Sequence, residues 1–176
     1  MAEISLEQAA STGNLEGVQQ ALRHQAPEIN PSILLEALNK AVFNGHSEIV
    51  KVLLANGAPI NGRARNGNTP LTCAVENLNA ELVKYLLDNC ADVNAQDESG
   101  ITPLHQAIDC EAEYAKSLYD GGDVDASPTI QISNVLIDAG ANVNAKNNRG
   151  ETPLRWALDQ WHKPAEDLLL RNGGHL

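Results

Sequence analysis

The chain has 176 residues, which suits one domain, and its hydrophobic content of 43% can build a core although aromatic residues make up only 3%. The net charge of −11 argues against binding to nucleic acid or to an anionic membrane, because both require a basic surface. The acidity is compatible with a basic protein partner, and the plainer alternative is that it serves solubility alone.

The sequence also points away from disulfides, metals and membranes. Its three cysteines, Cys73, Cys90 and Cys110, are odd in number and fit neither a disulfide framework nor a metal knuckle, which favours a reducing compartment. The five histidines are scattered, so we expect no metal and no cofactor. The N-terminal residues lack the basic and apolar regions of a secretory signal, and no stretch approaches the roughly 18 apolar residues of a membrane span. We expect a cytoplasmic protein, with export by a route that needs no signal left open.

The first half of the chain predicts paired helices. Residues 6–22 predict two short helices that turn at Gly13, and residues 24–30 predict an extended connector. Asn30 and Pro31 predict the cap and first position of an apolar helix, which is followed by a partner helix over residues 47–54.

The third pair follows the same plan. Thr69 is expected to cap a helix that starts at Pro70, and Asn79 to cap its partner. Cys90 occupies the place of the glycines that end the second helix of other units, which predicts a positive φ at Cys90 unless Asn89 takes that role.

The fourth unit is longer than the others. Thr69 and Thr102 are 33 residues apart, whereas Thr102 and Thr152 are 50 apart, so an insertion of 17 residues lies between them. The pattern of Ala112, Ala115 and Leu118 predicts that the insertion extends the first helix by two or three turns, ending at residues 121–122. Thr129 is expected to cap the next helix, over residues 132–138.

In the fifth unit the two tryptophans are expected to play different roles. Trp156 takes a position that faces the neighbouring helices. Trp161 replaces the glycine found in the turn at Gly13 and Gly45, so it is the one expected to be exposed.

The motif Thr-Pro-Leu-His at 102–105, its variants at 69–72 and 152–155, and Gly-Ala-Asn-Val-Asn at 140–144 resemble the ankyrin repeat. The resemblance implies an all-α solenoid of stacked helix-turn-helix units with β-hairpin loops, with repeats at about 1–30, 31–63, 64–96, 97–146 (insertion 111–128) and 147–176. It implies a non-catalytic, monomeric module that binds a partner protein through hairpin tips and first helices. The alternative is a bacterial or viral effector of this family that acts on host proteins.

The residues that match ankyrin contact positions lie at the hairpin tips and at the ends of the first helices. With the exposed aromatic residues of the insertion and the last unit, the expected partner-binding set is Arg63, Arg65, Asn66, Asn68, Glu76, Asn77, Glu98, Ser99, Ile101, Asp109, Tyr114, Tyr119, Arg149, Glu151 and Trp161. Phe43 matches another such position. The helix predicted at residues 31–35, where a tip should stand, places the contacts between the first two units in doubt.

Two further features carry hypotheses. His105 is expected to tie a hairpin to its helix rather than to act with a cysteine as a catalytic base. Residues 109–125 hold six acids against the single Lys116, and the six include Glu111. This acidic insertion is either a docking element for a basic partner or a solvated surface without function.

Overall fold

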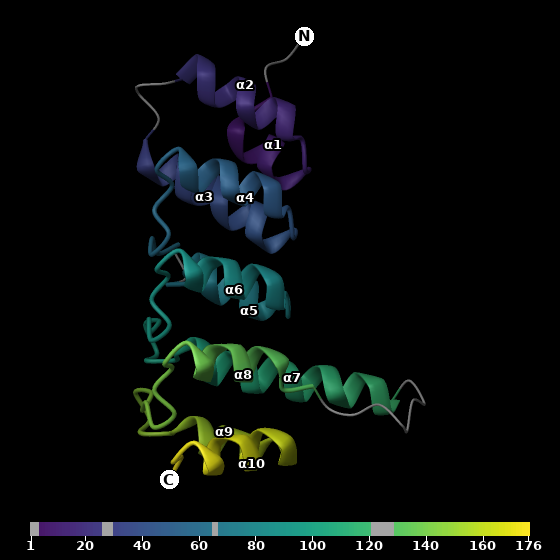
Figure 1. Ribbon diagram of the computed structural model, residues 1–176, viewed down its shortest axis with the longest axis vertical. Helices are drawn as coiled ribbons and strands as arrows, with labels where there is room; N and C mark the ends of the chain where they lie inside the picture. The colour runs from purple at the N-terminus through teal and green to yellow at the C-terminus, as the bar shows by residue number, and fades with distance from the viewer. Residues whose placement is uncertain (1–3, 26–29, 65–66, 121–128) are drawn as a thin grey trace.

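The structure is a computed structural model that describes residues 4–25, 30–64, 67–120 and 129–176. In these residues the chain forms five helix pairs stacked in chain order (Figure 1). The first helices are α1 (Leu6–Ser11), α3 (Pro31–Phe43), α5 (Pro70–Glu76), α7 (Pro103–Asp120) and α9 (Pro153–Asp159). The second helices are α2 (Leu15–Gln25), α4 (Ser47–Ala55), α6 (Ala80–Asp88), α8 (Gln131–Asp138) and α10 (Lys163–Arg171).

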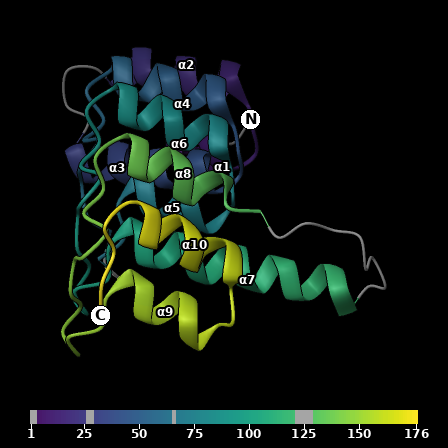
Figure 2. The same ribbon diagram turned by 60° about the horizontal axis from the view of Figure 1, so that its bottom comes forward.

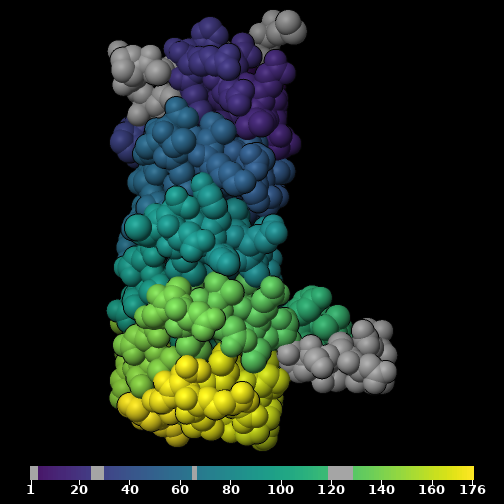
Figure 3. Space-filling model, viewed as in Figure 1, coloured from purple at the N-terminus to yellow at the C-terminus, as the bar shows by residue number. Residues whose placement is uncertain are grey.

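The helices form two layers. Each first helix packs on the next first helix along the stack, from α1 through α3, α5 and α7 to α9, and the second helices form the other layer (Figure 2). The described N-terminal and C-terminal segments therefore lie at opposite ends of an elongated molecule (Figure 3). One continuous core runs through all five pairs and is built of Leu, Ile, Val and Ala side chains, which allow the short helices to approach closely.

The predicted helix starts at Asn30, Thr69 and Asn79 are confirmed. Asn30 accepts a hydrogen bond from the Ser32 amide at 2.9 Å, with Pro31 at the first helical position. Thr69 forms a reciprocal capping box with Thr72, and Asn79 accepts from the Leu82 amide at 3.0 Å. These local caps explain why the third unit follows its sequence pattern so closely.

Four predictions are confirmed or corrected in detail. Helix α7 is extended as expected and reaches Asp120, and Cys90 has φ of 68° while Asn89 is its ordinary C-cap. Residues 24 and 25, expected to begin the connector, belong to α2, which continues to Gln25. No strand occurs in the described residues, so the expected β-hairpins are tight turns without ladders. The predicted helix end at residues 121–122 lies outside the described part of the chain.

Candidate functional site

The stack has two edges with different chemistry. The hairpin edge carries the turns 64–68, 97–101 and 147–151, which precede α5, α7 and α9. The helix-turn edge carries the C-terminal ends of the first helices and the turns that lead into the second helices. Figure 1 shows the two edges at opposite ends of the helices, with α7 projecting far beyond the helix-turn edge. The predicted contact residues are divided between these edges.

Each described hairpin turn is closed by its own backbone and, in two cases, by an acceptor side chain. The amide of Asp97 donates to the carbonyl of Ile101 at 3.0 Å, and the Asp97 carboxylate accepts from the amides of Ser99 and Ile101, both at 2.8 Å. Asn147 repeats this arrangement for Arg149 and Glu151. Ser99 and Ile101 therefore contribute their backbone to the turn, and Gly100, at φ of 77°, supplies the left-handed residue that the turn needs.

Long polar side chains at the hairpin edge connect successive units. Arg63 donates to the carbonyls of Gly67 in its own turn and of Gln96 in the next unit. Gln96 donates in turn to the Lys146 carbonyl at 3.2 Å, and Asn148 donates to the Glu98 carbonyl at 2.9 Å. The guanidinium of Arg63 is therefore engaged within the stack.

A ladder of asparagines links the loops that follow the second helices. Asn61 accepts from the Asp92 amide and donates to the Cys90 carbonyl of the next unit, at 2.8 and 3.2 Å. Asn94 makes the same pair of bonds to Asn142 and Gly140, and Asn144 to His175 and Gly173. Each rung pairs one backbone amide and one backbone carbonyl in the segment that follows the second helix of the next unit.

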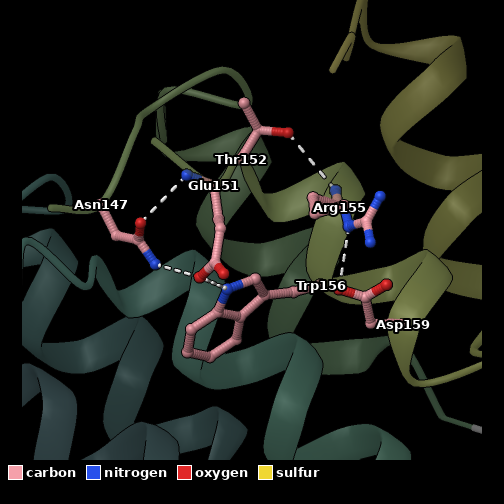
Figure 4. A network of polar contacts seen from close by, with 6 residues as sticks. All are labelled: Asn147, Glu151, Thr152, Arg155, Trp156 and Asp159. Carbon is pink, nitrogen blue, oxygen red and sulfur yellow. Dashed lines mark hydrogen bonds and ion pairs between the residues drawn. The ribbon is translucent and has the colours of Figure 1, made fainter. Parts of the chain in front are cut away.

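Glu151 is also engaged within the chain. Its carboxylate accepts from Asn147 Nδ2 at 2.7 Å and from the Trp156 indole at 3.2 Å, while Arg155 pairs with Asp159 one turn further along α9 (Figure 4). The hydrogen bonds from Asn147 and then Trp156 lower the pKa of Glu151. A surface depression of about 360 Å³ beside it is lined by Gly150, Glu151, Thr152, Arg155 and Leu176.

Exposed apolar side chains gather at the helix-turn edge and in the last unit. Phe43, the last residue of α3, is 58% exposed, although the residues that end α1, α5 and α9 are Ser11, Glu76 and Asp159. Trp161 is 92% exposed at φ of 56°, as predicted for its place in the turn. Leu78 has the same place in the third unit with φ of 50°, and it packs against the core.

The extended part of α7 (residues 110–120), here called the arm, has no counterpart in the other first helices. Gln160, the C-cap of α9, donates to Asp109 and accepts from Lys116, both at 2.6 Å, and so ties the arm to the last unit. Tyr114 is 46% exposed on the arm. The side chain of Tyr119, like Arg65 and Asn66, lies outside the described residues.

Glu111 corrects the expectation that all acids of the insertion are exposed. It is fully buried, and its carboxylate accepts from the amides of Ile132 and Ser133 at 2.7 and 3.3 Å and from the Ser133 hydroxyl at 2.5 Å. It therefore caps α8 from the preceding helix, whereas the predicted cap, Thr129, makes only a 3.3 Å bond to Gln131 and Ile130 is the N-cap. Burial raises the pKa of Glu111, against the opposing hydrogen bonds from Ser133 and Ile132.

The sequence did contain a signal for this cap. Leu104, Ile108, Glu111 and Ala115 follow helical spacing, which places Glu111 on the buried face of α7. A carboxylate at a buried position must find donors, and the nearest unpaired donors are the first amides of the next helix.

His105 ties two units together, as expected. It is fully buried, its Nδ1 lies 2.8 Å from Thr102 Oγ1, and its Nε2 lies 3.2 Å from the Glu151 carbonyl. Because a carbonyl only accepts, Nε2 donates and Nδ1 accepts in the neutral ring. Burial lowers the pKa of His105, and burial separately raises the pKa of Cys73 to about 11. In both cases burial favours the neutral form of the group.

Within the described residues, no helix is long and apolar enough to cross a membrane, and no three His, Cys, Asp or Glu side chains cluster to hold a metal ion. A family model described as ankyrin repeats (3 copies) matches residues 6–97 and 38–129, which together cover more than half of the chain. A search among curated proteins gave no match.

Proposed function

The chain belongs to the ankyrin-repeat family, whose members are general protein–protein interaction modules, and we propose that it binds a partner protein without catalysing a reaction. The proposed contact surface comprises the first-helix ends, the arm and the outward side chains of the hairpin turns. The predicted residues that belong to it are Arg63, Arg65, Asn66, Asn68, Glu76, Asn77, Glu98, Ser99, Ile101, Asp109, Tyr114, Tyr119, Arg149, Glu151 and Trp161, with Phe43 added.

The observation that carries the proposal is the exposure of apolar side chains on the helix-turn edge. Phe43 and Tyr114 are about half exposed on first helices whose neighbouring residues are buried in the core. Aromatic residues are enriched where proteins bind one another, because each removes a large apolar area from water on binding.

The two edges contribute differently in this proposal. At the hairpin edge, Arg63 and Glu151 already bond within the stack, so a partner gains little from their polar groups. Glu98 and Arg149 extend exposed side chains and are the better candidates there. We therefore place the larger share of the binding energy on the helix-turn edge.

The test is capture of partners on the immobilised chain from a lysate of its source, with three forms compared. One form carries F43S and Y114S, one carries E98S and R149S, and the third is unchanged. Point substitutions are preferable to deletion of residues 111–126, because that deletion removes the Glu111 cap of α8.

A partner that is retained by the hairpin-edge variant and lost by the F43S/Y114S variant supports the proposal. A partner lost only by the hairpin-edge variant would move the surface to the turns. Capture of no protein, together with turnover of a small molecule by the purified chain, would overturn the proposal. The alternative of a secreted effector uses the same surface, and specific capture from a host lysate alone distinguishes it.

A further inference from the structure

The arm and the neighbouring first-helix ends form an inside corner, which we call the arm corner. It comprises Phe43 on α3, Glu76 and Asn77 at the end of α5, and Cys110, Glu113 and Tyr114 on the arm. Figure 3 shows the arm standing out from the side of the stack, and α5 packs directly between α3 and α7. A segment lying along the stack edge would therefore meet the arm.

The corner is continuous rather than a set of distant residues. A Cβ placed on Gly45, in the turn after Phe43, would lie 3.7 Å from the Asn79 side chain of the next turn. One unit further, Cys110 receives a hydrogen bond from Gln106 at 3.6 Å, and after burial the carboxylates that raise the pKa of Cys110 include Glu76 and Glu113. Glu113 lies one helical turn beyond Cys110 on α7, and Glu76 ends α5, which packs against α7.

The helical positions of α7 place Cys110 and Tyr114 on one face, and Glu113, four residues from Asp109 and three from Lys116, lies at the edge of that face nearer to α9. Asp109 and Lys116 are seven residues apart and both bond Gln160, so that side of the helix faces α9. Glu111 and Ala115 are buried on the opposite side. Cys110 and Tyr114 are four residues apart and therefore project together, toward α5 rather than toward α9.

The negative charge of the arm corner indicates a partner with basic residues. Glu76, Asp109 and Glu113 form no ion pair within the described residues. Glu76 accepts one hydrogen bond from Asn68 Nδ2 at 2.9 Å and Asp109 accepts one from Gln160 at 2.6 Å, but neither bond neutralises the carboxylate. The nearby bases are already engaged, because Lys40 pairs with Glu36 at 3.0 Å and Lys116 bonds Gln160 on the α9 side. The corner therefore presents two exposed aromatic rings beside carboxylates that have no base of their own.

We propose, on the basis of the protein-binding function above, that the arm corner binds a basic amphipathic segment of a partner protein. In this arrangement, apolar side chains of the segment pack against Phe43 and Tyr114, and its lysines or arginines face Glu76 and Glu113. The arm limits how far the segment extends along the stack, which fixes its register. Such a site combines buried apolar anchors with charge complementarity at its rim.

The first experiment uses two fluorescein-labelled synthetic peptides and fluorescence anisotropy. One is an amphipathic peptide of leucine and lysine, and the other carries the same lysines with serine in place of leucine. The unchanged chain should bind the leucine peptide more tightly, and each of F43S and Y114S should weaken that binding by about tenfold, or about 1.4 kcal/mol. The matched control is L158S, which changes an apolar residue of α9 that is 38% exposed outside the corner and should alter the affinity by less than about twofold.

The salt dependence tests the carboxylates separately. The double variant E76Q/E113Q should bind the leucine peptide more weakly, and its affinity should fall less steeply with added salt. Circular dichroism and urea midpoints confirm that each variant is folded, and Y114S on the arm provides the test if F43S disturbs α3.

Several outcomes would overturn the inference. Equal binding of both peptides would assign the attraction to net charge alone, and equal binding to F43S, Y114S and the unchanged chain would remove the corner from the site. Self-association of the free chain that F43S abolishes, seen by analytical ultracentrifugation, would assign the corner to a second copy. A partner captured from lysate that is indifferent to F43S and Y114S overturns the corner but leaves the protein-binding function standing.

Discussion

The hairpin edge and the helix-turn edge use different residue types for different purposes. At the hairpin edge, the side chains of Arg63, Gln96 and Asn94 form hydrogen bonds to the backbone of the next unit. At the helix-turn edge, Phe43 and Tyr114 stay exposed, and the chain departs most from its own repeat. The comparison teaches that polar side chains at the hairpin edge bond successive units to one another, beside the common core, whereas the helix-turn edge leaves aromatic side chains exposed.

The largest change in the free energy of unfolding is expected from a substitution at the base of the arm. Substituting Glu111 with alanine leaves two amides and a hydroxyl of α8 without their acceptor in a buried position, which should lower the free energy of unfolding by about 3 kcal/mol. The matched control is E113A, two residues along the same helix and exposed, with an expected change within about 0.5 kcal/mol. Urea denaturation measures both, and equal midpoints for the two variants would contradict the assignment of Glu111 as a cap.

The asparagine ladder should give the next largest effect. Asn94→Ala removes the two bonds from Asn94 to Asn142 and Gly140, and should lower the free energy of unfolding by about 1–2 kcal/mol. Asn89→Ala is the control, because the Asn89 side chain bonds only to Tyr85 within its own helix end. If both variants unfold at the same urea concentration, the ladder does not couple the units.

A smaller change, in the direction of greater stability, is expected when two of the residues with positive φ are replaced by glycine. Cys90→Gly and Trp161→Gly should each raise the free energy of unfolding by about 0.5–1 kcal/mol, because glycine relieves left-handed strain at exposed positions. Leu78→Gly relieves similar strain but loses the packing of Leu78 on the core, so it should destabilise. Thermal and urea midpoints of the three variants test the sign, and a stabilised Leu78→Gly would mean that its packing contributes little.

The smallest expected effect is a pH dependence of the free energy of unfolding, which arises from two buried histidines, His105 near the hairpin edge and His162 at the helix-turn edge. Burial lowers the pKa of both His105 and His162 below the ordinary 6.5, so the unfolded chain binds more protons as the pH falls below about 6.5. Stability should therefore fall as the pH is lowered through this range and be fully present above it. His162 is 4% exposed, and the effect of its burial outweighs the opposing hydrogen bond to the backbone of Thr129.

Urea midpoints at pH 7.5 and pH 5.5 measure this dependence. The double variant H105Q/H162Q should show a smaller loss of stability on acidification than the unchanged chain, whereas H175Q, at an exposed position, should behave like the unchanged chain. An identical loss in all three would assign the acid sensitivity to other groups.

Most of the fold was predictable because its signals are local. Asn30, Thr69 and Asn79 define helix starts through bonds to residues two or three positions away, and Cys90 and Trp161 take positive φ because the turns around them require it. The arm followed from continued helical spacing at Ala112, Ala115 and Leu118. Family resemblance then indicated the stacking and the surface class.

The sequence by itself determined the helix pairs, their caps and the insertion within the fourth unit, since these depend on contacts between near neighbours along the chain. Only the tertiary structure decided which polar residues remain available at the surface. Glu111 is buried because α8 supplies donors for its carboxylate, and the guanidinium of Arg63 is engaged because the Gln96 carbonyl of the next unit accepts from it. The physical reason is that these hydrogen bonds join helices or units through residues 21 to 50 positions apart, and no local pattern along the chain specifies that partner.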